Sequence, residues 1–116
     1  MHELSVCQAI ADIVMRRADG RRVAVIHVRA GQLRQIVPDT LVFCWGLLTE
    51  DTPLAGAELD VEQVPARIAC RACRAEALIG DLPVFVCAAC GSTNVEITSG
   101  EEFLITSLDL AEEVPP

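Results

Sequence analysis

Two cysteine pairs of the form Cys-x-x-Cys constrain this chain of 116 residues more than any other feature. Cys70 and Cys73 form the first pair, Cys87 and Cys90 form the second, and thirteen residues separate the pairs. Two residues between cysteines let a tight turn direct both thiolates at one ion, and a second such turn completes a tetrahedron of four sulfurs. Because four thiolates leave no open coordination position, the pattern predicts a closed, structural Zn²⁺ site.

Other uses of the same cysteines compete with zinc. Iron in a rubredoxin-like four-sulfur site is the chemical competitor. Disulfides need an oxidising compartment, and a redox dithiol needs one pair free of metal. The chain opens with Met1-His2-Glu3 rather than a basic secretory leader, and no apolar run reaches the ~18–20 residues of a membrane span. We therefore expect a cytoplasmic protein without membrane contact, in which the paired cysteines bind zinc.

The two remaining cysteines, Cys7 and Cys44, lie outside these pairs. Cys7 falls in a predicted helix and Cys44 in an apolar run, with no histidine near either in the sequence. Buried free cysteines behave as small hydrophobic residues. We expect both to fill the core, and this interpretation is favoured more for Cys44 than for Cys7.

Apolar periodicity predicts helices and strands on both sides of the cysteine pairs. Residues 5–19 carry apolar side chains at helical spacing, including Ala9 and Ile13, and Ser5 is the predicted N-cap. Pro38 begins a second helix that continues through 41–48 and is expected to be mostly buried. Strands are predicted at 22–30, 57–62 and 102–110.

Charge is distributed unevenly along the chain, and it bears on the class of partner. The formal net charge is −8, and the segments 37–66 and 94–116 each carry six acidic residues and no basic one. A general nucleic-acid binder needs cationic side chains on phosphates, so this balance argues against nucleic acid. Three arginines around the first cysteine pair keep one alternative open, a zinc-ribbon module that binds protein or nucleic acid. A hydrolytic zinc enzyme is disfavoured because the site has no open position.

The N-terminus offers a second group of metal donors. His2 lies beside the first backbone amides and the free amine of Met1, so its imidazole and these nitrogens can close chelate rings on one ion. Nitrogen-rich, near-square-planar sites suit Ni²⁺ and Cu²⁺ more than Zn²⁺. Glu3 can act as a carboxylate ligand, as an orienting group or not at all. The other histidine, His27, is expected to be an ordinary exposed residue of the first strand.

These features together resemble a known family. The start Met1-His2-Glu3-Leu4-Ser5, the run Phe43-Cys44-Trp45 and the two cysteine pairs are similar to hydrogenase nickel-incorporation accessory proteins of the HypA/HybF type. Gly56-Ala57-Glu58-Leu59 and the closing strand through Leu108 extend the similarity over essentially the whole chain.

The resemblance implies an α+β fold, with a small three-stranded sheet, two helices and an inserted zinc-ribbon-like lobe. It implies a nickel-binding domain at 1–66, a zinc-binding domain at 67–93, and a strand at 94–116 that returns to the first domain. Its nickel site would use Met1, His2 and Glu3, and its zinc site Cys70, Cys73, Cys87 and Cys90.

The implied function is that of a nickel metallochaperone rather than an enzyme. Such a protein binds Ni²⁺ transiently, holds Zn²⁺ as a structural ion and delivers the nickel to the large subunit of [NiFe]-hydrogenase. The implied partners are a nickel-delivering GTPase and that large subunit, without nucleic acid or membrane. The resemblance leaves a homodimer open.

Overall fold

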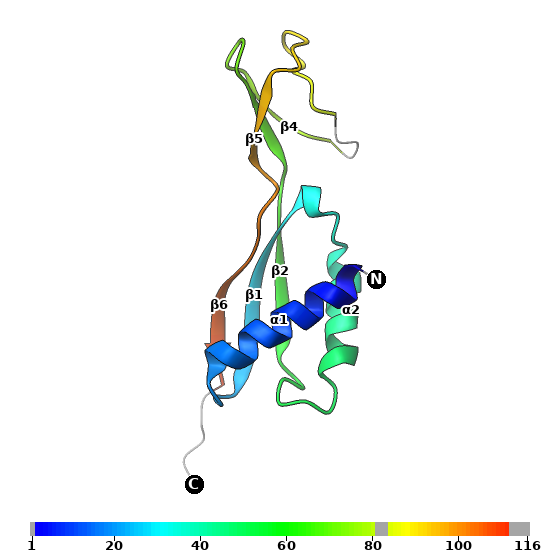
Figure 1. Cartoon of the computed structure of the whole chain (residues 1–116), viewed down its shortest axis with the longest axis vertical. Coiled ribbons are helices and arrows are strands. Elements are labelled where there is room, and N and C mark those ends of the chain that lie inside the picture. The colour runs from blue at the N-terminus through cyan, green and yellow to red at the C-terminus, as the bar shows by residue number, and fades with distance from the viewer. Residues whose placement is uncertain (1, 81–83, 112–116) are drawn as a thin grey trace. The chain divides into compact units, whose positions relative to one another are not determined.

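The computed structural model describes residues 2–80 and 84–111, which form helices and two small sheets. The elements are α1 (His2–Ala18), β1 (Val23–Gly31), the 3-10 helix η1 (Gln32–Arg34), α2 (Pro38–Thr49), β2 (Glu58–Val64), β3 (Arg67–Cys70), β4 (Glu76–Leu78), β5 (Val95–Ser99) and β6 (Phe103–Leu110) (Figure 1). One sheet has the strand order β2-β1-β6 and the other has the order β4-β3-β5. This α+β architecture confirms the predicted fold class.

The described residues fall into two compact units. The helical unit consists of the described residues of Met1–Val28, Ile36–Glu62 and Leu104–Pro116. The cysteine unit consists of those of Arg29–Gln35 and Gln63–Phe103. No helix in the described ranges is long and apolar enough to cross a membrane.

In the helical unit, α1 places one stripe of side chains in the core. Cys7, Ile10 and Val14 are fully buried along this stripe, and Figure 1 shows α1 crossing a face of the sheet. The predicted N-cap at Ser5 is wrong, because the helix begins at His2 and Ser5 lies inside it. Ile13 is exposed rather than part of the buried stripe, since it lies one residue off the positions that face the core.

Helix α2 begins at Pro38 as predicted, but only one side of it is buried. Leu41, Trp45 and Thr49 are spaced one turn apart and form the buried side. The indole Nε1–H of Trp45 donates to the carbonyl of Ala57 at 3.0 Å, which ties α2 to the turn before β2. The expectation of a mostly buried helix is wrong, because hydrophobic residues also occupy the opposite side.

The cysteine unit is built on the central strand β3. Antiparallel β4 and β5 flank it, with Ile68 opposite Ile97 and Cys70 opposite Val95 in the second pair. Val95 and Ile97 pack against the small core of Ala66, Ile68 and Ile79. Burial of these apolar side chains joins residues 95–99 to the cysteine unit. The family resemblance instead implies that residues 94–116 return together to the first domain.

Residues 29–35 complete the cysteine unit from a distant part of the sequence. The Gln32 side chain donates to the carbonyls of Ile79 and Gly80 and accepts from the amide of Ala66 at 2.9 Å. Gly31 donates its amide to the carbonyl of Glu102 at 2.6 Å. A Cβ at Gly31 would collide with the Gly100 carbonyl, so glycine is required for this close backbone approach.

Candidate metal centres

The two cysteine pairs form matched turns in the cysteine unit. In the first, the amide of Cys70 donates to Ala75 and that of Arg74 donates to Cys70, at 2.8 and 2.9 Å. In the second, the amide of Cys87 donates to Ser92 and that of Gly91 donates to Cys87, at 2.9 and 2.8 Å. The same offsets along the chain therefore produce the same turn twice.

Left-handed residues close both turns at the position after the second cysteine. Gly91 has φ 75° and Arg74 has φ 65°. The sequence indicates this geometry only at Gly91, because glycine adopts positive φ without a Cβ penalty. Arg74 carries that conformation as a non-glycine residue, and the shared hydrogen-bond pattern is what reveals it.

All four sulfurs of the pairs converge on one point. The Sγ atoms lie within 4.8 Å of one another, and the described residues hold no other such group of three or more metal-binding side chains. Cys70 and Cys90 are 3.6 Å apart at sulfur, as are Cys73 and Cys87. A tetrahedral zinc with Zn–S bonds of about 2.3 Å needs sulfurs about 3.8 Å apart. The donor set and its spacing therefore fit a closed zinc site.

Local electrostatics show why this cluster calls for a cation. Backbone N–H groups, first that of Cys73, lower the pKa of Cys70 to about 6. The amide of Ser92 lowers the pKa of Cys90, but the sulfurs of Cys70, Cys73 and Cys87 outweigh it and raise that pKa to about 12. Without a metal, therefore, the four cysteines are not all thiolates at neutral pH, and a dication would favour the fully deprotonated set.

The N-terminal donors lie at the start of α1. His2 is the first residue of the helix, and Glu3 stands in its first turn. Met1 lies outside the described residues, and His2 is described by its backbone alone. The structure therefore places the backbone of His2 and Glu3 one after the other at a helix terminus.

The two other cysteines differ in exposure. Cys7 is fully buried and donates its thiol to the carbonyl of Leu41 at 3.4 Å, whereas Cys44 is half-buried. Burial is the first cause that raises the pKa of Cys7, to about 11. Cys7 is therefore a core residue. The sequence favours Cys44 over Cys7 for the core, but Cys7 is the more deeply buried of the two.

His27 has hydrogen-bond partners that the sequence does not reveal. Its ring lies between Asp60 of β2 and Asp109 of β6, with nitrogen to oxygen distances of 3.0 and 2.8 Å. These hydrogen bonds, first that with Asp109, raise the pKa of His27. The predicted ordinary exposed histidine is thus held by two carboxylates, a pairing between residues far apart in the sequence.

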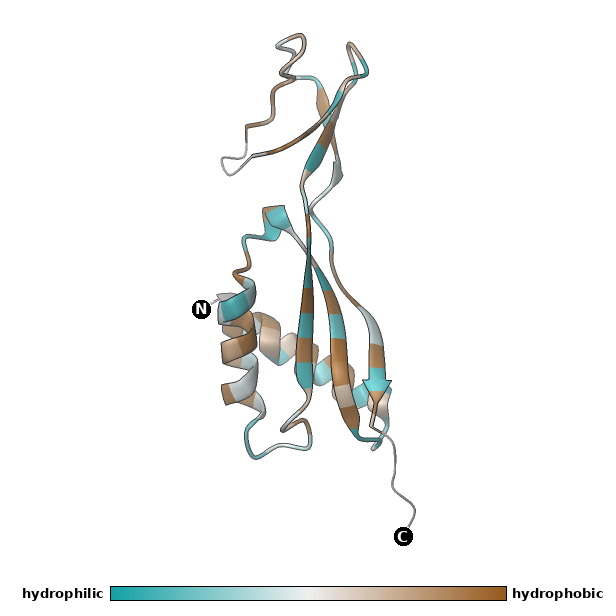
Figure 2. Cartoon of the chain, turned by 180° about the vertical axis from the view of Figure 1, so that it is seen from behind, coloured by the Kyte–Doolittle hydropathy of each residue, from teal (hydrophilic) through white to brown (hydrophobic). Residues whose placement is uncertain are grey.

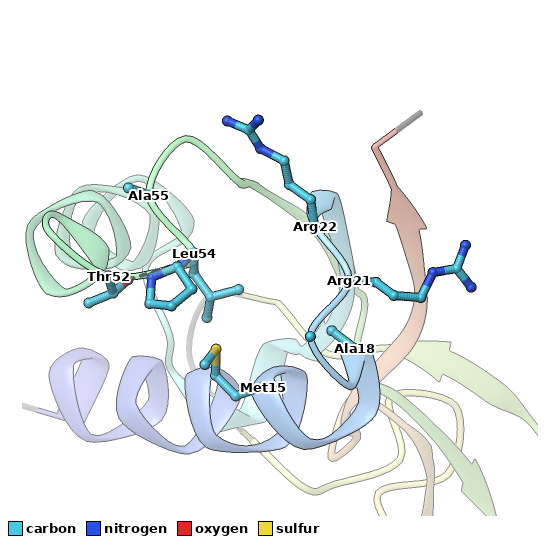
Figure 3. Close-up of a pocket in the computed structure, with 9 residues that line it drawn as sticks. Met15, Ala18, Arg21, Arg22, Thr52, Leu54 and Ala55 are labelled. Carbon is cyan, nitrogen blue, oxygen red and sulfur yellow. Dashed lines mark hydrogen bonds between the residues drawn. The ribbon is translucent and has the colours of Figure 1, made fainter. Parts of the chain in front are cut away.

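One cavity in the helical unit carries arginines but no metal ligands. It measures about 400 Å³ and is lined by Met15, Ala18, Arg21, Arg22 and the loop residues 52–55, among others. Figure 3 shows Arg21 and Arg22 extending away from each other. Because these side chains do not converge, they do not build an anion site.

Comparisons with known proteins agree with the geometry. Residues 1–110 match the model of the family described as hydrogenase/urease nickel incorporation, metallochaperone, HypA. The hydrogenase maturation factor HypA of Desulfosudis oleivorans is 39% identical over 97% of this chain and 100% of its own length. That of Geotalea uraniireducens is 39% identical over 95% of this chain and 99% of its own length.

Solved structures agree as well. The solution structure of the Ni metallochaperone HypA from Helicobacter pylori superposes with a TM-score of 0.65 at 25% identity, covering 97% of this chain and all of that one. A second HypA solution structure gives 0.69 at 25% identity, over 97% of this chain and 98% of the other. These matches confirm the resemblance noted in the sequence and disfavour a zinc-ribbon module without nickel function. The chain belongs to the HypA family of nickel metallochaperones, which act in hydrogenase maturation and are not enzymes.

Proposed function

We propose that this metallochaperone binds Ni²⁺ at its N-terminus, through Met1, His2 and Glu3. The imidazole of His2 and adjacent backbone nitrogens would supply most of the donors, with the amine of Met1 beside them. Glu3 would contribute its backbone nitrogen and an acidic side chain near the ion. In this proposal the helical unit is the nickel-binding domain and the cysteine unit, built around Cys70, Cys73, Cys87 and Cys90, is the zinc-binding domain.

One observation carries the proposal: α1 begins at His2. The first four N–H groups of an α-helix have no acceptor within the helix. The amides of His2 and Glu3 could therefore release their protons to water on coordinating nickel without breaking a hydrogen bond of the helix. A site further along α1 would cost such bonds.

The same position suits delivery of the ion. Nickel transfer is a ligand exchange, and a site of few side chains at a chain terminus can load and unload. A closed four-sulfur site cannot exchange in this way, so zinc stays while nickel moves. We propose the large subunit of [NiFe]-hydrogenase as the recipient and a nickel-delivering GTPase as the partner in transfer, both in the cytoplasm. The sequence leaves a homodimer open, and sedimentation of the zinc-loaded protein decides it.

Calorimetric nickel titration of the untagged protein tests the site. We expect His2→Ala to abolish nickel binding while one zinc per chain and the fold are retained. His27→Ala is the matched control, because it removes the other histidine and leaves the N-terminus intact. Unchanged nickel affinity in His2→Ala would refute the proposed site.

A second comparison tests the terminal amine separately. A protein with extra residues before Met1 loses the free amine at that position but keeps His2. We expect weaker nickel binding in this form than in the native form, with equal zinc content. Equal nickel affinity in the two forms would remove Met1 from the ligand set.

A further inference from the structure

The outward side of α2 is an apolar stripe on the helical unit. Phe43 is 67% exposed, Leu47 is 58% exposed and Val42 is 44% exposed. Gly46 lies between them, and a Cβ added there would meet no heavy atom within 4 Å. Figure 2 shows hydrophobic residues along most of α2. We call Val42, Phe43, Gly46 and Leu47 the α2 stripe, a surface of the kind that a second helix packs against.

A groove of about 570 Å³ continues the α2 stripe toward the sheet. Val42 and Gly46 line it from the helix, and Glu58 and Asp60 line it from β2. β2 is an edge strand of its sheet, so within the described residues no further strand pairs with its outer edge. The hydrogen bond from Trp45 to Ala57 anchors α2 beside β2 and so holds the groove in shape.

Acidic residues border the α2 stripe. Asp39 precedes Phe43 by one helical turn. Glu50 is the first residue after α2, three positions beyond Leu47. Segment 37–66, which contains both α2 and β2, has six acidic residues and no basic one. His27 also lines the groove, but its ring is already paired with two carboxylates. The surface is therefore apolar along its middle and negative at its border.

We propose that the α2 stripe docks an amphipathic helix of a partner protein, with apolar side chains flanked by lysine or arginine. Opposite charges around an apolar contact steer association and select the partner. A second copy of this chain is a poor occupant, since either orientation of α2 against α2 brings acidic borders together. Gly46 favours a helical occupant because it lets another backbone approach closely.

This proposal goes beyond the nickel site, because it rests on α2 and β2 alone. The two are separable by experiment: a nickel titration reports on the N-terminus and a docking assay reports on the α2 stripe. A variant of Phe43 is expected to keep its nickel affinity, whatever its docking behaviour.

Fluorescence anisotropy with the full zinc-loaded chain and a labelled synthetic helix tests the proposal. The probe is a peptide of about 18 residues with leucine on one face and arginine on the others. Its matched isomer carries glutamate in place of arginine. We expect the basic peptide to bind at least about tenfold more tightly than the acidic one, with an affinity that falls as salt rises.

Surface variants locate the binding site. We expect Phe43→Ser and Leu47→Ser each to weaken binding of the basic peptide at least about tenfold. Leu104→Ser is the matched control, since Leu104 is a 44% exposed apolar residue on β6 in the same unit. Its binding is expected to equal that of the unmodified chain, and circular dichroism and zinc content confirm that each variant is folded.

Three results would overturn the proposal. The first is equal affinity for the basic and acidic peptides. The second is an equal loss of binding in Leu104→Ser and Phe43→Ser, which would show non-specific adsorption. The third is a dimer in sedimentation that Phe43→Ser dissociates, which would assign the α2 stripe to a second copy of the chain.

Discussion

The imidazole Nε2 of His27 lies 2.8 Å from the carboxylate of Asp109, and the other ring nitrogen lies 3.0 Å from Asp60. His27 is on β1, the middle strand of the order β2-β1-β6, and the two acids are on its neighbours. One side chain therefore links all three strands of the sheet in the helical unit.

This link makes the stability of the helical unit depend on pH. The hydrogen bonds with Asp109 and Asp60 raise the folded-state pKa of His27, so their contribution is complete below the unfolded pKa of about 6.5. It is lost as pH rises through the folded pKa. Urea unfolding should show that His27→Gln lowers the free energy of unfolding more at a pH below about 6.5 than at a pH above the folded pKa of His27. A cost that stays constant or grows with pH would contradict the link.

Replacing Gly100 with alanine should destabilise the cysteine unit. Gly100 has φ +105°, and a Cβ there would lie 2.5 Å from the Cα of Ala66. Both the backbone conformation and the clash oppose a side chain, so we expect a loss of about 2–4 kcal/mol in the free energy of unfolding. Gly80→Ala is the control, because it meets no atom within 4 Å. Similar unfolding curves for the two variants would disprove this account.

Removal of the Gln32 side chain should weaken the same unit for a different reason. Gln32→Ala leaves the carbonyls of Ile79 and Gly80 and the amide of Ala66 without this partner. Because the hydrogen bonds to Ile79 and Ala66 are part-buried, we expect a loss of about 1–3 kcal/mol in the free energy of unfolding, measured with urea. Gln63→Ala, an exposed glutamine on β2, should change little. A comparable cost at both glutamines would argue against the hydrogen bonds as the cause.

Substitution of one zinc ligand should abolish zinc binding. Cys70→Ser removes a sulfur that accepts the amide of Cys73 at 3.4 Å and lies 3.6 Å from the sulfur of Cys90. Metal analysis is expected to find no tightly bound zinc in this variant and one zinc per chain in Cys44→Ser. Retention of stoichiometric zinc by Cys70→Ser would mean that the four-sulfur site is not the zinc site.

Local signals in the sequence predict much of this molecule. The cysteine spacing predicts the zinc turns, and Pro38 predicts the start of α2, because each depends on residues close together in the chain. The alternation of Ile26, Val28 and Ala30 predicts the buried face of β1, and all three are buried. The nickel ligands stay a prediction from position and family resemblance.

Contacts between distant segments account for what sequence patterns miss. The pairing of His27 with Asp60 and Asp109 joins residues up to 82 positions apart, and no local pattern encodes it. The exposed side of α2 is equally hidden, because Phe43 and Leu47 have the hydrophobicity of core residues. A sequence window cannot tell an apolar side chain that packs in the core from one that faces outward.

The division of the two units along the chain has a consequence for biosynthesis. The cysteine unit takes Arg29–Gln35 from the first third of the sequence and Gln63–Phe103 from the rest. The sheet of the helical unit takes its last strand from Phe103–Leu110. Because translation proceeds from the N-terminus, neither sheet can close before those late strands leave the ribosome. The nascent chain therefore exposes α1, with the proposed nickel donors at its start, well before either sheet is complete.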